Sequence, residues 1–234
     1  MIGLLLGADR GHSRTAYEIA GLAGCTPAYA YAYVEKLERD GFVRGTAVVR
    51  PRELIEHWIS IREKPRAIDY FVPNPVGLLV PAPTAHYAAT TYLAESRRYH
   101  YLVPVRWDLY IREADEVEWA AACRSLGALR GPGNVRLLVG DPWIAENAFE
   151  DGMTVEPAVG RDHLKWVGDP RLVVDLFVEG SVGVEAAELI MKRRGWDQRT
   201  RTQKRSWVGR TSRPSPRPRG IPLSWSAAGA CTSP

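Results

Sequence analysis

Residues 15–43 read TAYEIAGLAGCTPAYAYAYVEKLERDGFV, which contains two helical patterns separated by a short break. Thr15 and the glutamate three residues later have the spacing of a capping box, in which each side chain satisfies a free backbone N–H at the start of a helix. Gly24 can adopt the left-handed conformation that ends a short helix. Thr26 as N-cap and Pro27 as the first helical residue then begin a second helix. The segment therefore predicts a helix-turn-helix.

The second of these helices has an apolar face and an outward face. Ala30, Val34 and Leu37 recur at helical spacing and are expected to pack on the preceding helix. In a helix-turn-helix the front of the second helix enters the major groove of DNA, where a tyrosine can contact a phosphate or a thymine methyl group. The outward residues and the N-cap are therefore our predicted DNA contacts on this helix: Thr26, Ala28, Tyr29, Tyr31, Ala32 and Lys36.

A short hairpin is expected after the second helix. Residues 41–44 and 48–50 flank small residues that suit a hairpin tip. Arg44 and Arg50 would carry positive charge from this hairpin toward the DNA phosphates. With the remains of a first helix before the capping box, this order of elements predicts a winged helix-turn-helix over residues 1–50.

A second interpretation of this module stays open. Winged helices also occur in proteins that dimerise without touching DNA. The predicted recognition helix offers Lys36 but no arginine or asparagine at its front, so few hydrogen bonds to base edges are expected. A protein-interaction module whose winged helix mediates dimerisation is therefore the alternative to a DNA-binding regulator.

The rest of the folded chain alternates helical and extended patterns, which predicts a mixed α/β (α+β) protein. Helical patterns are expected at residues 53–59, 85–96, 116–126, from 170 onward and 184–192. Extended segments are expected at residues 70–72, 76–80, 101–105, 107–111 and 134–139. The predicted organisation is a winged helix at 1–50, a linking helix and strand at 51–83, a C-terminal regulatory domain at 84–195 and a tail at 196–234.

The positive charge of the chain is concentrated near its end. Residues 192–234 hold 11 of the 31 Lys and Arg residues and one of the 27 Asp and Glu residues, so residues 1–191 carry 20 basic and 26 acidic groups. Nucleic-acid binding by the folded body must therefore depend on a local motif and not on overall charge. The tail at 196–234 is rich in Arg, Ser and Pro and is expected to be disordered.

Motifs of the common enzyme classes are missing from the sequence. It contains no Walker loop, dinucleotide glycine motif, H-E-x-x-H or G-x-S-x-G. The two Gly-Asp-Pro segments, at 140–142 and 168–170, predict turns in which the aspartate caps a helix. Cys25, Cys123 and Cys231 form no C-x-x-C pair and are expected to be reduced thiols, the first two buried. We expect no catalytic residue, no cofactor and no metal site, and hence no enzyme.

No apolar run approaches the length of a membrane span, and the first residues lack the pattern of a signal peptide. The expected location is therefore cytoplasmic, without a membrane partner.

Several pieces, in their order along the chain, resemble the AbiEi family, the antitoxin and transcriptional regulator half of type IV toxin–antitoxin systems. The pieces are the winged helix ending at Asp40–Val43, then Pro51–Trp58, Trp107–Ile111, Asn134–Val139, Val167–Leu176 and Val184–Leu189. The resemblance covers about residues 1–195. It implies a repressor, not an enzyme, that binds repeats in double-stranded DNA at its own promoter, and a C-terminal domain that counteracts a nucleotidyltransferase-like toxin. The short first helix and the basic tail depart from the family pattern, and the oligomeric state stays open.

Overall fold

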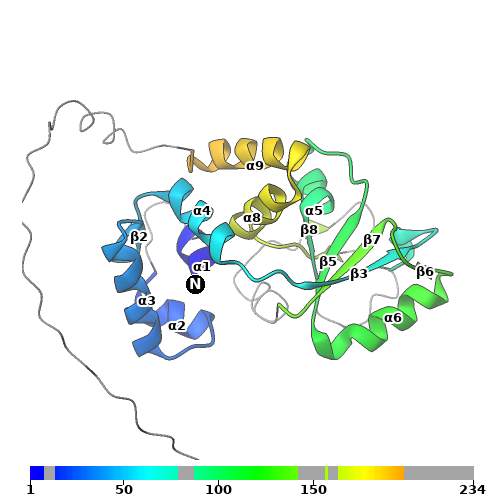
Figure 1. The fold of residues 1–234 in the computed structure, drawn as a ribbon, viewed down its shortest axis with the longest axis horizontal. Coiled ribbons are helices and arrows are strands. Elements are labelled where there is room, and N and C mark those ends of the chain that lie inside the picture. Colours follow the sequence, from blue (N-terminus) through cyan, green and yellow to red (C-terminus); the bar gives the residue numbers. More distant parts are fainter. Residues whose placement is uncertain (8–13, 79–86, 142–155, 158–162, 198–234) are drawn as a thin grey trace, which may run out of the picture. The chain divides into compact units, whose positions relative to one another are not determined.

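The computed structural model describes residues 1–7, 14–78, 87–141, 156–157 and 163–197. Met1–Arg199 belong to one compact unit, and Thr200–Pro234, which belong to a second, lie outside the described residues. The described part is a mixed α/β structure, as expected (Figure 1). No helix in the described ranges combines the length and the apolar character needed to cross a bilayer.

The helices are α1 (Ile2–Leu6), α2 (Ala16–Leu22), α3 (Pro27–Arg39), α4 (Pro51–Ile61), α5 (Thr91–Arg98), α6 (Glu116–Ser125), α8 (Asp169–Glu179) and α9 (Ser181–Arg194), with short 3-10 helices η1 (Pro75–Leu78) and η2 (Glu113–Asp115). The strands are β1 (Val43–Arg44), β2 (Ala47–Val48), β3 (Arg66–Phe71), β4 (Tyr87–Thr90), β5 (Trp107–Ile111), β6 (Leu129–Arg130), β7 (Val135–Val139), β8 (Glu156–Pro157) and β9 (His163–Leu164).

The largest sheet of the described residues has the strand order β4-β5-β7-β3-β6. The central strand β7 runs parallel to its neighbour β5, with Leu109 opposite Leu137, and the remaining pairs are antiparallel. All five residues of β5 are buried. The alternation of apolar and polar residues in this strand is therefore not an alternation between core and solvent, and it instead gives the sheet one apolar and one polar buried face.

The apolar face packs on α6 (Figure 1). Trp119 and Cys123 of this helix are fully buried, and the Trp119 ring meets Tyr87 of β4 edge-on, with the ring centroids 5.6 Å apart. Burial raises the pKa of the Cys123 thiol to about 11, which agrees with the expected inert, buried thiol. Cys25 is only partly buried, and Cys231 lies outside the described residues.

The polar face of the sheet is covered by α8 and is held by ion pairs. Arg106 binds Asp108 of β5 at 2.7 Å and Glu179 of α8 at 2.8 Å. Arg136 of β7 binds Asp69 of β3 at 2.8 Å. Because Asp108 is buried and its charge must be paired, the Arg106 bridge from Asp108 to Glu179 restricts where α8 can lie over the sheet.

A buried cluster around Asp175 of α8 completes this face. Its carboxylate accepts hydrogen bonds from Thr90 Oγ1 at 2.6 Å and from Tyr110 Oη at 3.1 Å. The same carboxylate pairs with Arg62 at 2.9 Å and with Arg171 at 3.0 Å. Burial and then the Asp175 charge raise the pKa of Tyr110, so its hydroxyl stays protonated. One carboxylate thus joins β4, β5, α8 and the chain that follows α4.

The short helix α1 packs among α2, α4 and α8. All of its residues are buried. A Cβ at Gly3 would lie 2.9 Å from the Trp58 ring of α4, so a larger side chain there would displace the ring or the helix. The residues expected to be the remains of a first helix therefore form a buried contact with α4.

The expected helix at residues 85–96 is wrong in its first half. Tyr87–Thr90 form β4, which pairs with β5, and the helix begins at Thr91. All four residues of β4 are buried, so buried and exposed positions do not alternate along the strand. Without that alternation a sequence pattern cannot distinguish a strand from a buried helix.

The two expected extended segments at 76–80 and 101–105 are also wrong where the structure describes them. Pro75–Leu78 form a 3-10 helix instead of an extended chain. The backbone N–H groups of Tyr101 and Leu102 donate to the Glu95 carboxylate, so this stretch follows the end of α5 and does not join the sheet.

The second Gly-Asp-Pro segment begins α8 as expected, but Asp169 is not the cap. Gly168 occupies the N-cap position, and Asp169 is the first helical residue. Its carboxylate is buried and pairs with Arg98 at 2.6 Å and with Arg194. The ion pairs, which a local pattern cannot reveal, turn this side chain into the core. The other Gly-Asp-Pro segment leads into residues outside the described part.

Replacing Asp175 with asparagine tests how much the buried cluster contributes to the free energy of unfolding. Asp175→Asn leaves Arg62 and Arg171 without their shared counter-charge, and we expect the free energy of unfolding to fall by about 3–5 kcal/mol. Urea denaturation followed by tryptophan fluorescence measures this change. The matched variant Glu118→Gln, at an exposed position of α6, should stay within about 0.5 kcal/mol of the parent. An equally small loss for Asp175→Asn would contradict the central role of the cluster.

Candidate nucleic-acid interface

Both helix starts expected in residues 15–43 are confirmed. The Thr15 side chain accepts from the Glu18 N–H at 3.2 Å, and the Glu18 carboxylate accepts from the Thr15 N–H at 2.6 Å. Gly24 has a φ of +61°, the left-handed conformation that the turn requires. Thr26 Oγ1 accepts from the Tyr29 N–H at 3.3 Å and so caps α3. These local hydrogen bonds set the boundaries of α2 and α3.

The packing of α2 against α3 agrees with the predicted apolar face. Ala30, Val34 and Leu37 of α3 are buried, and so is Ile19 of α2. This packing leaves the opposite face of α3 open, and every predicted contact residue on the helix and its cap is exposed: Thr26, Ala28, Tyr29, Tyr31, Ala32 and Lys36.

The two exposed tyrosines of α3 do not lie side by side. Residues two apart on a helix are separated by about 200° around its axis, so Tyr29 and Tyr31 flank the open face on opposite sides. Their exposed fractions are 58% and 60%. The Tyr29 ring stacks on the half-buried Tyr33 with the centroids 6.5 Å apart. The middle of the open face consists of the small residues Ala28 and Ala32 and the exposed carboxylate of Glu35.

Arg39, in the last turn of α3, belongs to the open face but was missing from the predicted set. Its side chain is exposed, and it stands three residues after Lys36, at the spacing of neighbours on one helix face. The signal was present in the sequence, since Ala32, Lys36 and Arg39 have the i, i+4, i+7 spacing of one helix face.

The hairpin expected after α3 is present as β1 and β2. Val43 pairs with Val48, and Arg44 pairs with Ala47. The Gly45 N–H at the tip donates to the Glu38 carboxylate of α3 at 2.9 Å, which ties the hairpin to the helix. Arg44 is exposed on this hairpin, as predicted.

Arg50 is exposed as well but is placed differently from Arg44. It is the N-cap residue of α4, after the hairpin has ended. A Cβ at Gly41 would lie 3.0 Å from Arg50 Nη2, so the guanidinium covers the turn that follows α3. The structure therefore separates the two arginines, with Arg44 on the hairpin and Arg50 beside the end of the helix.

The charge of this surface is nearly balanced. Between Arg14 and Arg50 the chain carries five cationic side chains and four carboxylates. Two of the carboxylates are engaged locally, Glu18 in the capping box and Glu38 at the hairpin tip. The exposed cations are thus few, and any attraction to an anionic partner must come from Lys36, Arg39, Arg44 and Arg50 together.

Comparison of the chain with protein-family models, with curated proteins and with solved structures found no match. Within the described ranges, no group of three or more His, Cys, Asp and Glu side chains is arranged to hold a metal ion.

Removing the N-cap of α3 tests how much the Thr26 side chain stabilises the first turn of this helix. Thr26→Ala deletes the acceptor of the Tyr29 N–H and should lower the free energy of unfolding by about 1 kcal/mol, whereas Thr26→Asp keeps an acceptor and should stay close to the parent. Urea denaturation of the three proteins compares them. Equal stability of the alanine and aspartate variants would show that the cap does not hold this helix.

Proposed function

We propose that the chain is a DNA-binding transcriptional regulator, with α1–α3 and the β1–β2 hairpin acting as a winged helix-turn-helix. The observation that carries this proposal is the open face of α3, with its capped front, lying next to a hairpin that is tied to the same helix through Glu38. In such modules the second helix enters the major groove, and the wing contacts the sugar-phosphate backbone.

Under this proposal the contacts divide by chemistry. Arg44, Arg50, Lys36 and Arg39 bind phosphates, which gives affinity without sequence information. Tyr29 and Tyr31 face the two walls of the groove from opposite flanks of α3, where they can reach a phosphate or a thymine methyl group. Ala28 and Ala32 leave room for close approach of the duplex. With few donors to base edges, sequence discrimination is expected to be modest in a single copy.

The resemblance to the AbiEi family supports the finer form of this proposal, in which the chain is an autorepressing cytoplasmic antitoxin and not an enzyme. The DNA would then be repeats at its own promoter, and the sheet with α5, α8 and α9 would belong to the part that counteracts a nucleotidyltransferase-like toxin. A gene for such a toxin next to the gene for this chain is expected.

A protein-interaction module is the second candidate, and the aromatic character of the surface favours it. Tyr17 on α2, with 69% of its surface exposed, adds to Tyr29 and Tyr31, and the local charge is nearly balanced. Tyrosine is enriched at protein interfaces. In this candidate the same face of α3 binds a second copy of the chain.

Removing the arginines around α3 tests the DNA proposal. Arg44→Ala and Arg50→Ala should each weaken binding to a labelled duplex from the region upstream of the gene by about five-fold to ten-fold. Each should also reduce the slope of log K against log salt by about 0.9, because one phosphate contact is lost. Fluorescence anisotropy between about 50 and 200 mM salt measures both quantities.

The matched control is Arg97→Ala, an exposed arginine on α5, which should change neither the affinity nor the slope. Unchanged binding of Arg44→Ala would remove the hairpin from the interface, and unchanged binding of Arg50→Ala would remove the start of α4.

The dimerisation alternative predicts a different outcome for the tyrosines. Tyr29→Ala together with Tyr31→Ala should convert a dimer to a monomer in sedimentation velocity without DNA, while the DNA proposal predicts loss of duplex binding at an unchanged sedimentation coefficient. A dimer that fails to bind any duplex, and that these two substitutions dissociate, would replace the DNA proposal with the alternative.

A further inference from the structure

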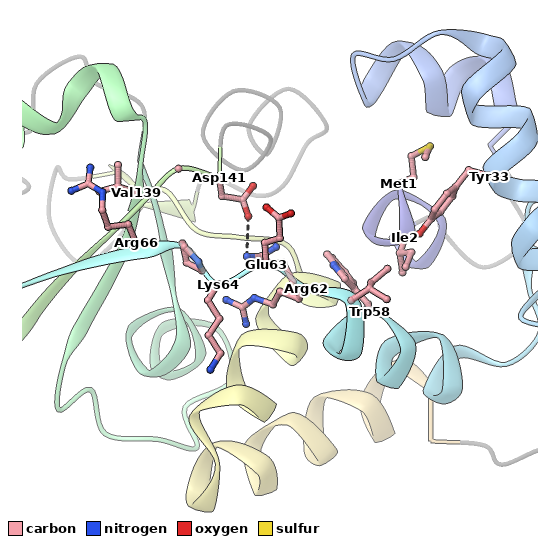
Figure 2. Close-up of a pocket in the computed structure, with 14 residues that line it drawn as sticks. Met1, Ile2, Tyr33, Trp58, Arg62, Glu63, Lys64, Arg66, Val139 and Asp141 are labelled. Atoms are coloured by element: carbon pink, nitrogen blue, oxygen red, sulfur yellow. Dashed lines mark ion pairs between the residues drawn. The ribbon is translucent and has the colours of Figure 1, made fainter. Parts of the chain in front are cut away.

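A cavity of about 410 Å³ lies beside the segment that connects α4 to β3 (Figure 2). Trp58 and Ile61 of α4 form an apolar part of its wall, and Arg62 and Lys64 of the connecting segment form a cationic part. Two carboxylates also line the cavity, Asp141, which pairs with Arg171, and the exposed Glu63. Its size is within the range of sites that hold small organic molecules. The cavity does not include the exposed face of α3.

Arg62 is only partly satisfied by the protein. Its side chain is 9% exposed, and its Nη2 binds Asp175 at 2.9 Å and Tyr110 Oη at 3.1 Å. Among the described residues, neither Nε nor Nη1 of Arg62 has a hydrogen-bond acceptor. Buried guanidinium N–H groups without an acceptor are costly, so an acceptor supplied from the cavity would be favourable.

Lys64 places a second positive charge next to these donors. Figure 2 shows the Arg62 side chain pointing toward the Lys64 side chain. Lys64 is exposed, whereas two other cations of the wall are neutralised, Arg171 by Asp141 and Asp175, and Arg66 by Glu116. An anionic group that accepts from Arg62 would also be attracted by the exposed charge of Lys64.

We propose that this cavity binds a small organic carboxylate, whose oxygens accept from the free donors of Arg62 and pair with Lys64 and whose apolar body packs on Trp58 and Ile61. Arg62 supplies directional hydrogen bonds, and Lys64 supplies charge at the open side. The apolar wall selects against bare inorganic anions, which have no group to bury there. The proposal does not rest on the proposed DNA binding, although Tyr33, which stacks on Tyr29 of α3, also lines the cavity.

Benzoate is a suitable probe because it combines a carboxylate with a flat apolar ring. We expect saturable binding of 4-fluorobenzoate to the full chain, followed by ¹⁹F NMR, with a dissociation constant of about 0.1–10 mM, as is usual for a ligand of this size. Acetate, inorganic phosphate and the neutral benzamide, at matched ionic strength, should each compete at least about five-fold more weakly than benzoate. Competition by phosphate that equals that of benzoate would overturn the apolar part of the site.

Substitutions then assign the site. Arg62→Lys keeps a charge toward Asp175 but removes the free Nε and Nη1 donors, and it should weaken binding at least about ten-fold. Lys64→Glu, at an exposed position that leaves the core intact, should weaken binding by about three-fold or more. Arg97→Gln, exposed on α5, is the matched control and should bind as the parent does.

Because Lys64→Glu does not disturb the buried cluster, it tests whether the carboxylate binds in this cavity even if the Arg62 variant fails to fold. Absence of 4-fluorobenzoate binding to the parent chain, or binding that Lys64→Glu leaves unchanged, would overturn the proposal.

Discussion

The carboxylate of Asp175 is the interaction on which the arrangement of the described residues depends. It accepts hydrogen bonds from β4 and β5 and pairs with arginines from α8 and from the end of α4. The sheet presents a polar face to α8, and a helix can cover such a face only if each buried charge meets a partner. The position of α8 is therefore set by charge pairing together with its buried apolar residues, such as Leu172 and Leu176, while α6 is held by apolar packing on the other side of the sheet.

This cluster also holds the N-terminal helices next to the sheet. Arg62, which follows α4, is anchored to Asp175, and at the other end of α4 Arg52 binds Glu188 of α9 at 2.5 Å. Trp58, between these two anchors, lies against Gly3 of α1. Ion pairs at both ends of α4 therefore join this helix, and with it the N-terminal helices, to the buried core.

The candidate interface on α3 and the cavity beside the α4–β3 segment are built in different ways. The open face of α3 is positioned by local hydrogen bonds. These are the caps of α2 and α3 and the hydrogen bond from the hairpin tip to Glu38. The cavity arises where α4, β3 and β7 meet, and its distinguishing feature is an arginine whose remaining donors are unused within the described residues. The two are connected through α3, because Tyr33 lines the cavity and also stacks on Tyr29 of the open face.

The amino-acid sequence by itself determined the elements whose stabilising contacts are local. The capping box at Thr15 and the N-cap at Thr26 were predictable because the groups that form them are close along the chain. The strand at residues 107–111 was predictable from the alternation of its own residues, although its partner strands are distant. Tertiary structure alone decided that residues 87–90 form a strand, that Asp169 turns into the core and that Arg62 lines a cavity. Each of these depends on partners far along the chain, and a buried segment contacted on all sides carries no periodic pattern that could reveal them.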